Sequence, residues 1–505
     1  MKCAQVYLIG SGPGDPGLLT LRGAACLAAS DVVLYDGLSN VAMLSHAPNA
    51  QHICVGKHGQ SRIWKQEEII AEMLQHVSHG KTVARLKGGD PAVFARTAEE
   101  VDALKAAEIP FEIVPGITAA LAAGSYAGIP VTHRKWASAV ALVTGHEEPD
   151  KPESALDWDA LAKFPGTLVI YMGVTTAETW TRALLDAGKP ADTPAAILRR
   201  VSLPDQQSIH CRLDEVTDHL TPASKFRPPA IVILGAVTKL AETMSWFEHR
   251  PLFGTRILVT RPENQSEELA AGLRELGAEV TSQPAITISA PESWDEVDRC
   301  LNQITAGDTL VFASRNGVRF LAKRWTENGL DARHFAGVRI AAVGTRTAEA
   351  LQEHGLRADI VPDDFTAEGL ASTLSPDAQD RRFWLIRASR GRNVLAETLQ
   401  NAGGNVDQIV TYRNEDTAVA DPHIADQLQQ GSFDWVTVTS SAIARSLHNL
   451  YGDALFQTKL ASISPITTQT LSEIDSLNAS PVAAEATTFT MAGLIEAILK
   501  HKQES

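Results

Sequence analysis

Two carboxylates stand where an apolar run of the chain gives way to a loop. Asp36 directly follows the run Val32–Tyr35, and Asp90 follows a pair of glycines. Open α/β sheets place their ligands at the carboxyl ends of their strands, so both side chains are candidates for a site there. A carboxylate in such a place can take a proton from a reacting group. The alternative for Asp36 is a helix cap or an Asx turn before Gly37.

The first loop of the chain, Gly10–Gly17, contains four glycines and two prolines and follows an apolar strand. So little side-chain bulk lets backbone approach a ligand closely. Asp15 stands where the dinucleotide fingerprint requires its third glycine, and no Gly-Lys-Ser/Thr follows for a phosphate loop. The loop is therefore predicted to bind a ligand, but in neither of the two common nucleotide-binding ways.

In three further segments a short apolar run ends at Gly or Pro: Arg85–Pro91, Val114–Ala120 and Tyr171–Val174. With the first loop they closely resemble the tetrapyrrole methyltransferases, and uroporphyrinogen-III C-methyltransferase in particular, over residues 1–245. The resemblance implies a two-lobed fold that binds S-adenosylmethionine and methylates two pyrrole carbons of uroporphyrinogen III, giving precorrin-2. Related enzymes that methylate a different precorrin share much of the pattern and remain an alternative.

The resemblance also implies catalytic roles, because methyl transfer needs positioning and one group that handles a proton. Asp36 occupies the proposed general-base position of the family, and Lys57 falls on its proposed proton donor. An equally good interpretation is that Lys57 binds a substrate carboxylate, because the pKa of a lysine ammonium must be shifted from its ordinary value before the group is useful as an acid. Gly37 departs from the family, which usually carries Arg there, so an orienting salt bridge or a carboxylate contact is in doubt.

Ten residues are carried over as contacts of S-adenosylmethionine, the methyl donor. They lie in loops and at strand ends: Pro13, Gly88, Gly89, Asp90, Val93, Thr118, Ala119, Met172, Val201 and Ala230. The Asp90 carboxylate can receive the ammonium or the hydroxyls of that ligand. Met172 offers a soft apolar surface for its adenine, and the alternative for this residue is a core position. Val201 stands where relatives commonly have Gly.

The substrate of such an enzyme is a polycarboxylate, and this chain has a formal net charge of -15. The protein must therefore concentrate positive charge locally to hold it. The cations expected there are Arg22, Arg85 and Lys87, with Lys57, Arg96, Arg134 and Lys135 as further candidates. The alternative for each is a solvated surface position.

The chain begins again as a second α/β protein after Trp246–Gly254, a segment with the composition of a linker. Three strand–helix units of this half recur in order. Arg256–Val280 is similar to Arg382–Val406, Asp308–Ser314 to Asp434–Ser440, and Ala341–Thr345 to Ala461–Pro465. Units that occur twice predict two similar lobes with a cleft between them. The alternative is that unrelated α/β units look alike.

This half resembles uroporphyrinogen-III synthase over about residues 255–500, through motifs such as Val259–Pro262, Phe312–Val318 and Ala342–Ala348. The resemblance implies that hydroxymethylbilane loses water and closes to uroporphyrinogen III with ring D inverted. The main task of such an enzyme is to hold its flexible linear substrate in one conformation. The lobes would be interleaved, the first strand–helix unit packing with residues beyond about 417 and the middle segment forming the other lobe.

Tyr412 is the candidate to help the hydroxyl of that substrate leave. The alternative is a strand residue that fills the interface between the lobes. Loops after strands are expected to meet the carboxylates of the substrate as nests or helix N-termini. The substrate-binding residues expected there are Ser314, Asn316, Gly317, Ser440, Ser441 and Thr467.

Length and composition limit the remaining classes. A chain of 505 residues has room for about two to four domains with ample cores. The negative charge argues against nucleic acid and anionic membranes as partners. Five scattered cysteines without a CxxC pair indicate a reducing cytoplasm and no structural zinc. Neither a signal peptide nor a membrane span is recognised, so a cytoplasmic protein is expected.

The sequence therefore predicts a bifunctional α/β enzyme of tetrapyrrole biosynthesis. It comprises a two-lobed methyltransferase at 1–245, a linker at 246–254 and a synthase with two similar parallel-sheet lobes at 255–505. The expected cofactor is S-adenosylmethionine, with no metal, and the expected partners are small tetrapyrroles. A homodimer through the methyltransferase half is left open, as is the fate of precorrin-2 in sirohaem or cobalamin. The alternative function is a methyltransferase with a non-catalytic module that binds tetrapyrrole.

Overall fold

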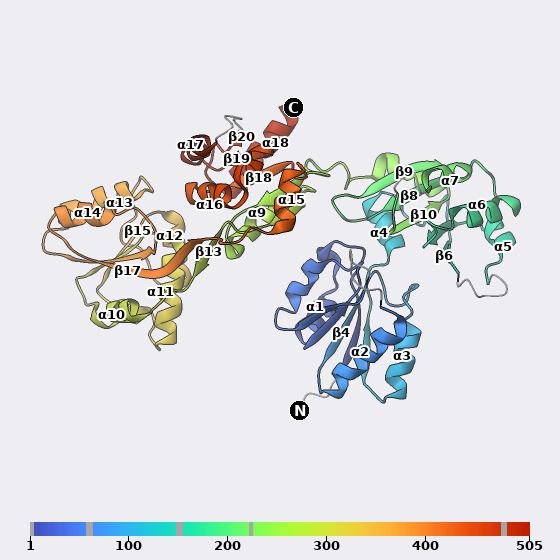
Figure 1. The fold of residues 1–505 in the computed structure, drawn as a ribbon, viewed down its shortest axis with the longest axis horizontal. Coiled ribbons are helices and arrows are strands. Elements are labelled where there is room, and N and C mark those ends of the chain that lie inside the picture. The colour runs from blue at the N-terminus through green and yellow to red at the C-terminus, as the bar shows by residue number, and fades with distance from the viewer. Residues whose placement is uncertain (1–4, 57–63, 148–154, 222–225, 476–481, 505) are drawn as a thin grey trace. The chain divides into compact units, whose positions relative to one another are not determined.

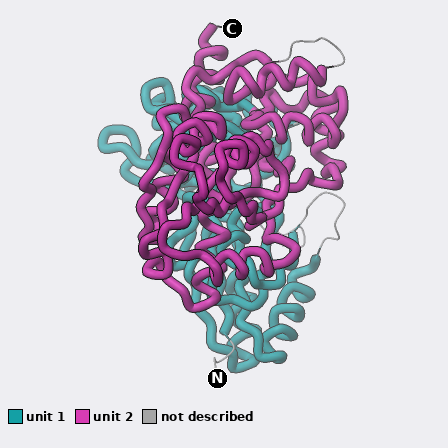
Figure 2. Tube along the Cα trace, turned by 90° about the vertical axis from the view of Figure 1, so that its left-hand side faces the viewer, with its two compact units in different colours: residues 1–255, 273–279 teal, residues 256–272, 280–505 magenta. Residues whose placement is uncertain are grey.

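The computed structural model describes residues 5–56, 64–147, 155–221, 226–475 and 482–504. They divide into two compact units, residues 1–255 with 273–279 and residues 256–272 with 280–505 (Figure 2). Each unit contains two lobes built on a sheet of five strands. Among the helices of the described ranges, none is long and apolar enough to cross a membrane.

The first lobe of unit 1, which is blue in Figure 1, is a parallel sheet in the order β3-β2-β4-β1-β5. Its strands are β1 (Val6–Gly10), β2 (Val32–Tyr35), β3 (Gln51–Cys54), β4 (Val83–Lys87) and β5 (Phe111–Val114). Its helices are α1 (Leu21–Ala28), α2 (Gln66–Ser78) and α3 (Thr97–Ala106). The two central strands pair from Val6↔Val83 to Gly10↔Lys87. Because the strands are parallel, the loops at their carboxyl ends meet at one edge of the sheet.

The second lobe of unit 1 is a mixed sheet in the order β6-β7-β10-β8-β9. Its strands are β6 (Val140–Thr144), β7 (Thr167–Tyr171), β8 (Pro194–Arg199), β9 (Gln207–Arg212) and β10 (Ala230–Leu234). Its helices are α4 (Ala119–Tyr126), α5 (Trp158–Lys163), α6 (Ala177–Asp186), α7 (Val216–His219) and α8 (Ala241–Met244). Only β6 and β7 are parallel; β7, β10, β8 and β9 alternate in direction.

One sequence expectation about this lobe is wrong. The polar, proline-containing composition of segment 146–163 predicts that it leads from the first lobe into a second one that begins at Thr167. Strand β6 precedes that segment and already pairs with β7, from Val140↔Thr167 to Thr144↔Tyr171. Val140–Val143 is itself a continuous apolar run, so the sequence carried the signal for this strand, although only Val143 of it is buried.

The segment 246–254, expected as a linker, packs against unit 1 rather than extending from it. The ring of Phe247 meets that of Tyr126 edge-on at 4.8 Å. Leu252 is fully buried, and its backbone N–H donates to the carbonyl of Leu276 at 2.8 Å. The division between the units falls just after this segment, at residues 255 and 256.

Unit 2 contains two lobes whose chain segments are interleaved, as expected from the sequence. One sheet has the order β12-β11-β18-β19-β20 and the other β13-β17-β16-β14-β15. The first lobe comprises β11 (Arg256–Val259), α9 (Glu263–Glu275), β12 (Glu279–Ser282), α15 (Pro422–Gln429), β18 (Trp435–Val438), α16 (Ser441–Tyr451), β19 (Lys459–Ser462), α17 (Pro465–Ile474), β20 (Val482–Glu485) and α18 (Met491–Glu504). The second comprises β13 (Ile286–Ser289), α10 (Asp295–Gln303), β14 (Thr309–Phe312), α11 (Arg315–Glu327), β15 (Arg339–Ala342), α12 (Thr345–Glu353), α13 (Ala367–Leu374), β16 (Arg382–Ala388), α14 (Val394–Asn401) and β17 (Asn405–Asp416).

The strand order supports the internal repeat. The order β12-β11-β18-β19 in one sheet corresponds to β17-β16-β14-β15 in the other, which places the paired sequence segments in equivalent positions. Even the outer strand β20 has a counterpart, because Ala341 of β15 forms a parallel bridge with Ile360. Two lobes with the same topology are what a duplicated unit predicts.

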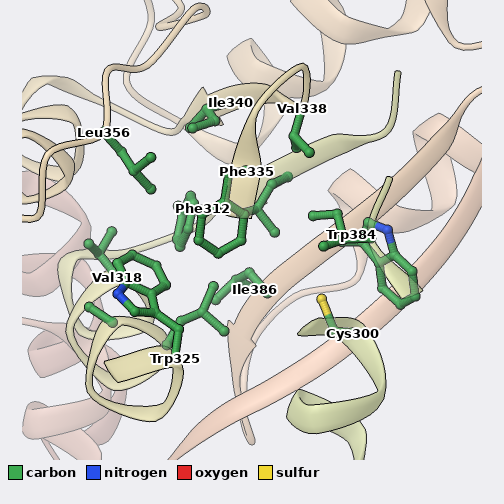
Figure 3. Close-up of a cluster of buried hydrophobic side chains, with 14 of the residues drawn as sticks. Cys300, Phe312, Val318, Trp325, Phe335, Val338, Ile340, Leu356, Trp384 and Ile386 are labelled. Carbon is green, nitrogen blue, oxygen red and sulfur yellow. The ribbon is translucent and has the colours of Figure 1, made fainter. Parts of the chain in front are cut away.

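On one face of β14 and its neighbours, the core of the second lobe in unit 2 is a cluster of large side chains (Figure 3). Phe312 and Trp384 are fully buried, and Cys300 is 1% exposed. The indole N–H of Trp384 donates to Asp308 at 3.0 Å, so its polar atom is satisfied inside the core. This packing fixes the strand ends from which the loops of the site emerge.

Candidate functional site

A cavity of about 450 Å³ lies between the carboxyl edge of the first sheet and the second lobe of unit 1. The structure brings all ten residues expected to contact S-adenosylmethionine to its wall. They are Pro13, Gly88, Gly89, Asp90, Val93, Thr118, Ala119, Met172, Val201 and Ala230. These residues come from segments that are far apart in the sequence. They meet because the ends of β1, β4 and β5 in the first sheet face the ends of β7 and β8 and the start of β10.

Backbone packing at the floor of this cavity requires glycine. A Cβ on Gly10 would lie 2.6 Å from the Cα of Gly116, and one on Gly116 would lie 2.2 Å from the carbonyl of Gly89. Gly89 itself has φ +71°, and a Cβ there would have ordinary contact with Thr118 at 3.9 Å. The space in front of Gly89 is therefore the cavity, and a ligand can lie directly on its backbone.

Asp90 and Tyr171 hold the cavity wall together. The Asp90 carboxylate accepts hydrogen bonds from Ala92 N–H at 2.7 Å and from Gly116 N–H at 2.9 Å. An ionised carboxylate has about four acceptor positions, so it retains capacity for a ligand donor. The Tyr171 hydroxyl lies 2.7 Å from Thr118 Oγ1 and accepts from Ala120 N–H, which ties the second lobe to the start of α4. Burial raises the pKa of Tyr171, so this hydroxyl stays protonated.

Three residues of the wall adopt left-handed backbone conformations that only glycine favours: Phe94 at φ 51°, Met172 at φ 54° and Arg200 at φ 51°. Such conformations cost on the order of 1–3 kcal/mol each and cluster at ligand sites. Arg200 is also charged, but its Nε contacts Asp205 at 2.6 Å. Sequence reasoning missed Phe94, Tyr171 and Arg200, because nothing in their local sequence marks a positive φ or a cross-lobe contact.

Asp36 lies beside the cavity rather than in its wall. Its Oδ1 contacts Arg85 Nη2 at 2.5 Å, and its Oδ2 accepts from the N–H of Gly88, a wall residue, at 3.4 Å. The side chain is 28% exposed. It is not a helix cap, since the helix that follows, Val41–His46, is capped by Asn40. Lys57, the other residue expected to transfer a proton, lies outside the described residues.

The three cations expected to bind substrate carboxylates are already engaged. Arg85 and Lys87 are 3% and 2% exposed and point into the protein, where both contact Glu100. Arg22 is on the surface, and its Nε donates to Glu112 at 2.6 Å. The structure brings Arg85 and Lys87 together with Asp36, and neither of the two lines the cavity. Arg134 and Lys135, from the wider set, are exposed.

In unit 2, the Tyr412 hydroxyl lies 2.9 Å from Ser314 Oγ. Ser314 is the N-cap of α11 and accepts from the N–H of Gly317 at 3.1 Å. Tyr412 is buried, and its ring stacks on Phe320. Burial raises the pKa of the Tyr412 hydroxyl, so it keeps its proton through neutral pH. The structure thus joins Tyr412, Ser314 and Gly317 in one cluster at the first turn of α11.

A chain of hydrogen bonds links this cluster to the other lobe of unit 2. Gln265 Nε2 on α9 donates to Asn316 Oδ1 at 3.2 Å, and Arg261 Nη2 donates to Gln265 Oε1 at 3.0 Å. Arg261 follows β11 and Asn316 follows β14. The carboxyl ends of the two sheets therefore face each other, and the loops expected to bind substrate lie where the lobes meet.

Three arginines gather at this junction that sequence reasoning did not select. Burial and the neighbouring charges of Arg315 and Arg346 lower the pKa of Arg261. Arg315 and Arg346 begin the adjacent helices α11 and α12, because β14 and β15 are parallel neighbours. Both side chains are exposed, and neither forms an ion pair within the described part of the chain. The sequence signal was present, because each arginine comes two to four residues after a buried strand.

The remaining residues expected to bind substrate lie at equivalent strand ends of the other lobe. Ser440 caps α16 by accepting from Ile443 N–H at 3.2 Å, and Ser441 Oγ accepts from Thr470 Oγ1 at 2.8 Å. Thr467 is buried, and its Oγ1 lies 3.1 Å from Ser464 Oγ, the cap of α17. Ser440 is half-buried at the first turn of α16, and the hydroxyls of all three residues have local partners. No group of three His, Cys, Asp or Glu among the described residues is arranged to hold a metal ion.

Two family models match the chain. The Tetrapyrrole (Corrin/Porphyrin) Methylases model matches residues 5–217. The Uroporphyrinogen-III synthase HemD model matches residues 267–496. The two matches do not overlap, and each covers one of the two halves that the sequence motifs distinguish.

The relatives with the longest matches span both halves. Porphyrin biosynthesis protein HemD of Ruminiclostridium josui is 34% identical over 444 residues, which are 88% of each chain. Uroporphyrinogen-III C-methyltransferase of Bacillus subtilis strain 168 is 35% identical over 382 residues, 75% of each chain. A solved uroporphyrin-III C-methyl transferase from Thermus thermophilus, complexed with S-adenyl homocysteine, is 40% identical; its whole length aligns with 47% of this chain at a TM-score of 0.41. The chain is therefore a fusion that belongs to the tetrapyrrole methylase family through its first half and to the uroporphyrinogen-III synthase family through its second.

Proposed function

We propose that the chain catalyses two successive steps of tetrapyrrole biosynthesis. The second half closes hydroxymethylbilane to uroporphyrinogen III with inversion of ring D and loss of water. The first half transfers two methyl groups from S-adenosylmethionine to that product and yields precorrin-2. The observation that carries the proposal is the cavity of unit 1, whose wall contains all ten residues expected for the methyl donor.

The cavity suits S-adenosylmethionine in shape and chemistry. When bound, this group supplies a methyl attached to a sulfonium. The bare backbone of Gly89 offers a surface on which the ligand can lie, and a Cβ at that position would project into the same space. Asp90 keeps acceptor positions for an ammonium or a hydroxyl, and Met172 presents an apolar, half-exposed side chain. Val201 stands where relatives commonly have Gly but still lines the cavity.

Asp36 is proposed to take the proton that the methylated pyrrole carbon must lose. Its carboxylate is partly exposed beside Gly88, close to where the methyl group would be delivered. Replacing Asp36 by Asn keeps shape and hydrogen bonding but removes the basicity. If Asp36 is the base, turnover should fall by roughly 10²–10⁴, the usual size of a general-base contribution. S-Adenosylmethionine affinity, measured by calorimetry, should change little. A rate within a few-fold of the parent would remove Asp36 from the mechanism.

The exposed cations Arg134 and Lys135 are proposed to meet carboxylates of the tetrapyrrole in unit 1, with Lys57 in the same role or as a proton donor. In unit 2, Arg261, Arg315 and Arg346 are proposed to do so, beside the capped first turns of α11 and α16. Each group would act on a polyanionic substrate, and cations gathered locally in an acidic protein are the electrostatic feature that would attract it.

Tyr412 is proposed to protonate the hydroxyl that leaves hydroxymethylbilane. The carbon–oxygen bond breaks, water departs with the proton of an acid, and an azafulvene remains. Ring closure through a spiro intermediate and loss of a ring proton then give the type III isomer. The arrangement of Tyr412 against Ser314 keeps the phenol fixed and protonated, as an acid requires. Most of the remaining task is orientation of a flexible substrate between the lobes.

The test is to give the purified chain hydroxymethylbilane with and without S-adenosylmethionine and to identify the products. Uroporphyrinogen III without the donor and precorrin-2 with it would support both activities. Only the type I isomer, which forms without a catalyst, would favour a non-catalytic second half. Uroporphyrinogen III supplied directly then tests the first half alone. Failure to methylate it would favour a different precorrin as substrate.

A further inference from the structure

Glu100, on helix α3, is a fully buried carboxylate surrounded by cations from the neighbouring strand. Its Oε2 contacts Lys87 Nζ at 2.6 Å, and its Oε1 contacts Arg85 Nε at 3.3 Å. Gln66 Nε2 on α2 donates to the same Oε1 at 3.2 Å. Glu100 is 0% exposed, so a single carboxylate joins two helices and a central strand inside the lobe.

The contacts continue from Glu100 to the edge of the cavity. Arg85 is held at its Nε by Glu100, and its Nη1 donates to the carbonyl of Leu86 at 3.1 Å. Its Nη2 contacts Asp36 Oδ1 at 2.5 Å. A guanidinium is planar, so fixing Nε and Nη1 also fixes the direction of Nη2. The orientation of the Asp36 carboxylate therefore depends on Glu100 through one rigid group.

Stability alone gives a weak reason for this arrangement. Burying ionised groups is costly, and replacing a buried ion pair by well-packed apolar side chains is often neutral or stabilising. Burial indeed lowers the pKa of Lys87. The network also does not end inside the protein. It ends on Asp36, which is 28% exposed and whose second oxygen faces the N–H of Gly88 in the cavity wall.

We propose that Glu100 is a positioning residue for methyl transfer: it fixes Arg85, and Arg85 holds the Asp36 carboxylate in the direction that proton removal requires. Lys87 supplies the second positive charge, so two carboxylates and two cations balance within the lobe. This inference rests on the proposed function of Asp36. It differs from that proposal in assigning a role to a residue that touches neither substrate nor cofactor.

The main test replaces the Lys87–Glu100 ion pair by apolar side chains, in the double variant Lys87→Met with Glu100→Leu on the full chain, in which the buried Arg85 keeps Asp36 as its counter-charge. Thermal stability should be kept, because both new side chains are apolar and of similar size. Methyl-transfer kcat should fall by roughly 10- to 100-fold, the effect of a small displacement of a reacting group. The Kd for S-adenosylmethionine and the cyclisation rate of the second half should not change.

Two comparison variants separate positioning from general damage. Lys87→Met with Glu100→Gln returns an acceptor oxygen to Arg85 Nε and should recover part of the lost rate. Asp102→Asn removes an exposed carboxylate from the same helix and should leave methylation unchanged. Equal rates for the Leu and Gln variants, or a parent-like rate for both, would overturn the inference.

A double-mutant cycle with Asp36→Asn gives the decisive readout. If Glu100 acts through Asp36, removing the ion pair from the Asp36→Asn chain should cause little further loss. If the two losses multiply, Glu100 acts by another route and the inference is wrong. If Asp36→Asn methylates slowly but the Lys87→Met, Glu100→Leu variant methylates at the parent rate, the inference is overturned and the proposed function stands. A parent-like Asp36→Asn variant overturns both.

Discussion

The Tyr412 hydroxyl lies 2.9 Å from Ser314 Oγ, at the point where strand β17 meets the first turn of helix α11. The tyrosine ring is stacked on Phe320 with centroids 5.7 Å apart and an angle of 12° between the planes. One helix, α11, thus holds the phenol at two points, through the hydroxyl of its N-cap and through the ring of Phe320. Such a phenol is fixed in position before substrate arrives, and burial keeps it protonated by raising its pKa.

The first prediction is for Tyr412→Phe. The ring and its stacking remain, and only the hydroxyl is lost, so the cost in stability should be about 1 kcal/mol. If the hydroxyl is the acid, type III formation should slow by roughly 10²-fold or more. Rate measurements on the full chain with hydroxymethylbilane check this, with methylation of added uroporphyrinogen III as the control. A cyclisation rate within a few-fold of the parent would leave Tyr412 with packing alone.

The second prediction is for Gly89→Ala. A Cβ at this position would project into the cavity, and φ +71° is a conformation that alanine adopts at a cost of about 1–2 kcal/mol. The Kd for S-adenosylmethionine should rise by roughly tenfold or more, while cyclisation of hydroxymethylbilane continues at the parent rate. Calorimetry and the two activity assays on one sample separate these effects. Parallel loss of both activities would indicate misfolding instead.

The residues at the cavity could be predicted because the family resemblance carries each of them over within a local motif. The parallel strands of the first sheet explain why Pro13, Gly89 and Thr118 meet at one edge, whereas Met172, Val201 and Ala230 come from the mixed sheet of the second lobe. Arg85 and Lys87 were selected for their charge as ligands of substrate carboxylates, and residues two apart on a strand share one face. Both faces of β4 are covered, as its fully buried pattern shows, so that face is interior. Glu100 lies in a helix rich in charged residues, and the sequence does not distinguish it from its exposed neighbour Glu99.

The synthase half was less predictable for a related reason. The internal repeat predicted the two lobes and their interleaving, because each strand–helix unit can be recognised from a short stretch of sequence. The contact of Gln265 with Asn316 joins residues of different lobes, and no local pattern encodes it. The convergence of Arg261, Arg315 and Arg346 depends on the same approach of the two sheet edges, which only the three-dimensional structure gives.

The third prediction concerns the thiol of Cys300. Burial raises its pKa to about 12, and the side chain is 1% exposed within the core shown in Figure 3. The thiolate is the reactive form, and its fraction rises only as pH approaches that value. At pH 8 Cys300 should remain unmodified by iodoacetamide in the native protein and react after unfolding in guanidinium chloride. Mass spectrometry of the peptide that contains Cys300 measures this. Rapid native labelling would mean that this core opens frequently.

The fourth prediction tests the proposed domains 1–245 and 255–505. Pro251 is exposed between Phe247 and Leu252, which are both buried. A protease site inserted after Pro251 should allow cleavage into two soluble pieces. The ring contact of Phe247 with Tyr126 stays with the first piece, and the hydrogen bond of Leu252 to Leu276 stays with the second. Each piece should keep its activity after separation by gel filtration. Aggregation or inactivity of either piece would place the boundary elsewhere.

The last prediction concerns the three arginines at the junction of the lobes in unit 2. Arg346 is exposed and has no ion pair within the described residues, so Arg346→Gln should not disturb folding. An exposed charge contact contributes up to about 1 kcal/mol, so the KM for hydroxymethylbilane should rise by roughly three- to fivefold with kcat unchanged. The double variant Arg315→Gln with Arg346→Gln should show a larger rise. Both effects should shrink as salt is added, because screening weakens exposed charge contacts.

The matched control is Arg357→Gln, which changes an exposed arginine beyond the far end of α12 and should leave KM unchanged. Equal KM values for the parent and the double variant at low salt would exclude this cluster from substrate binding.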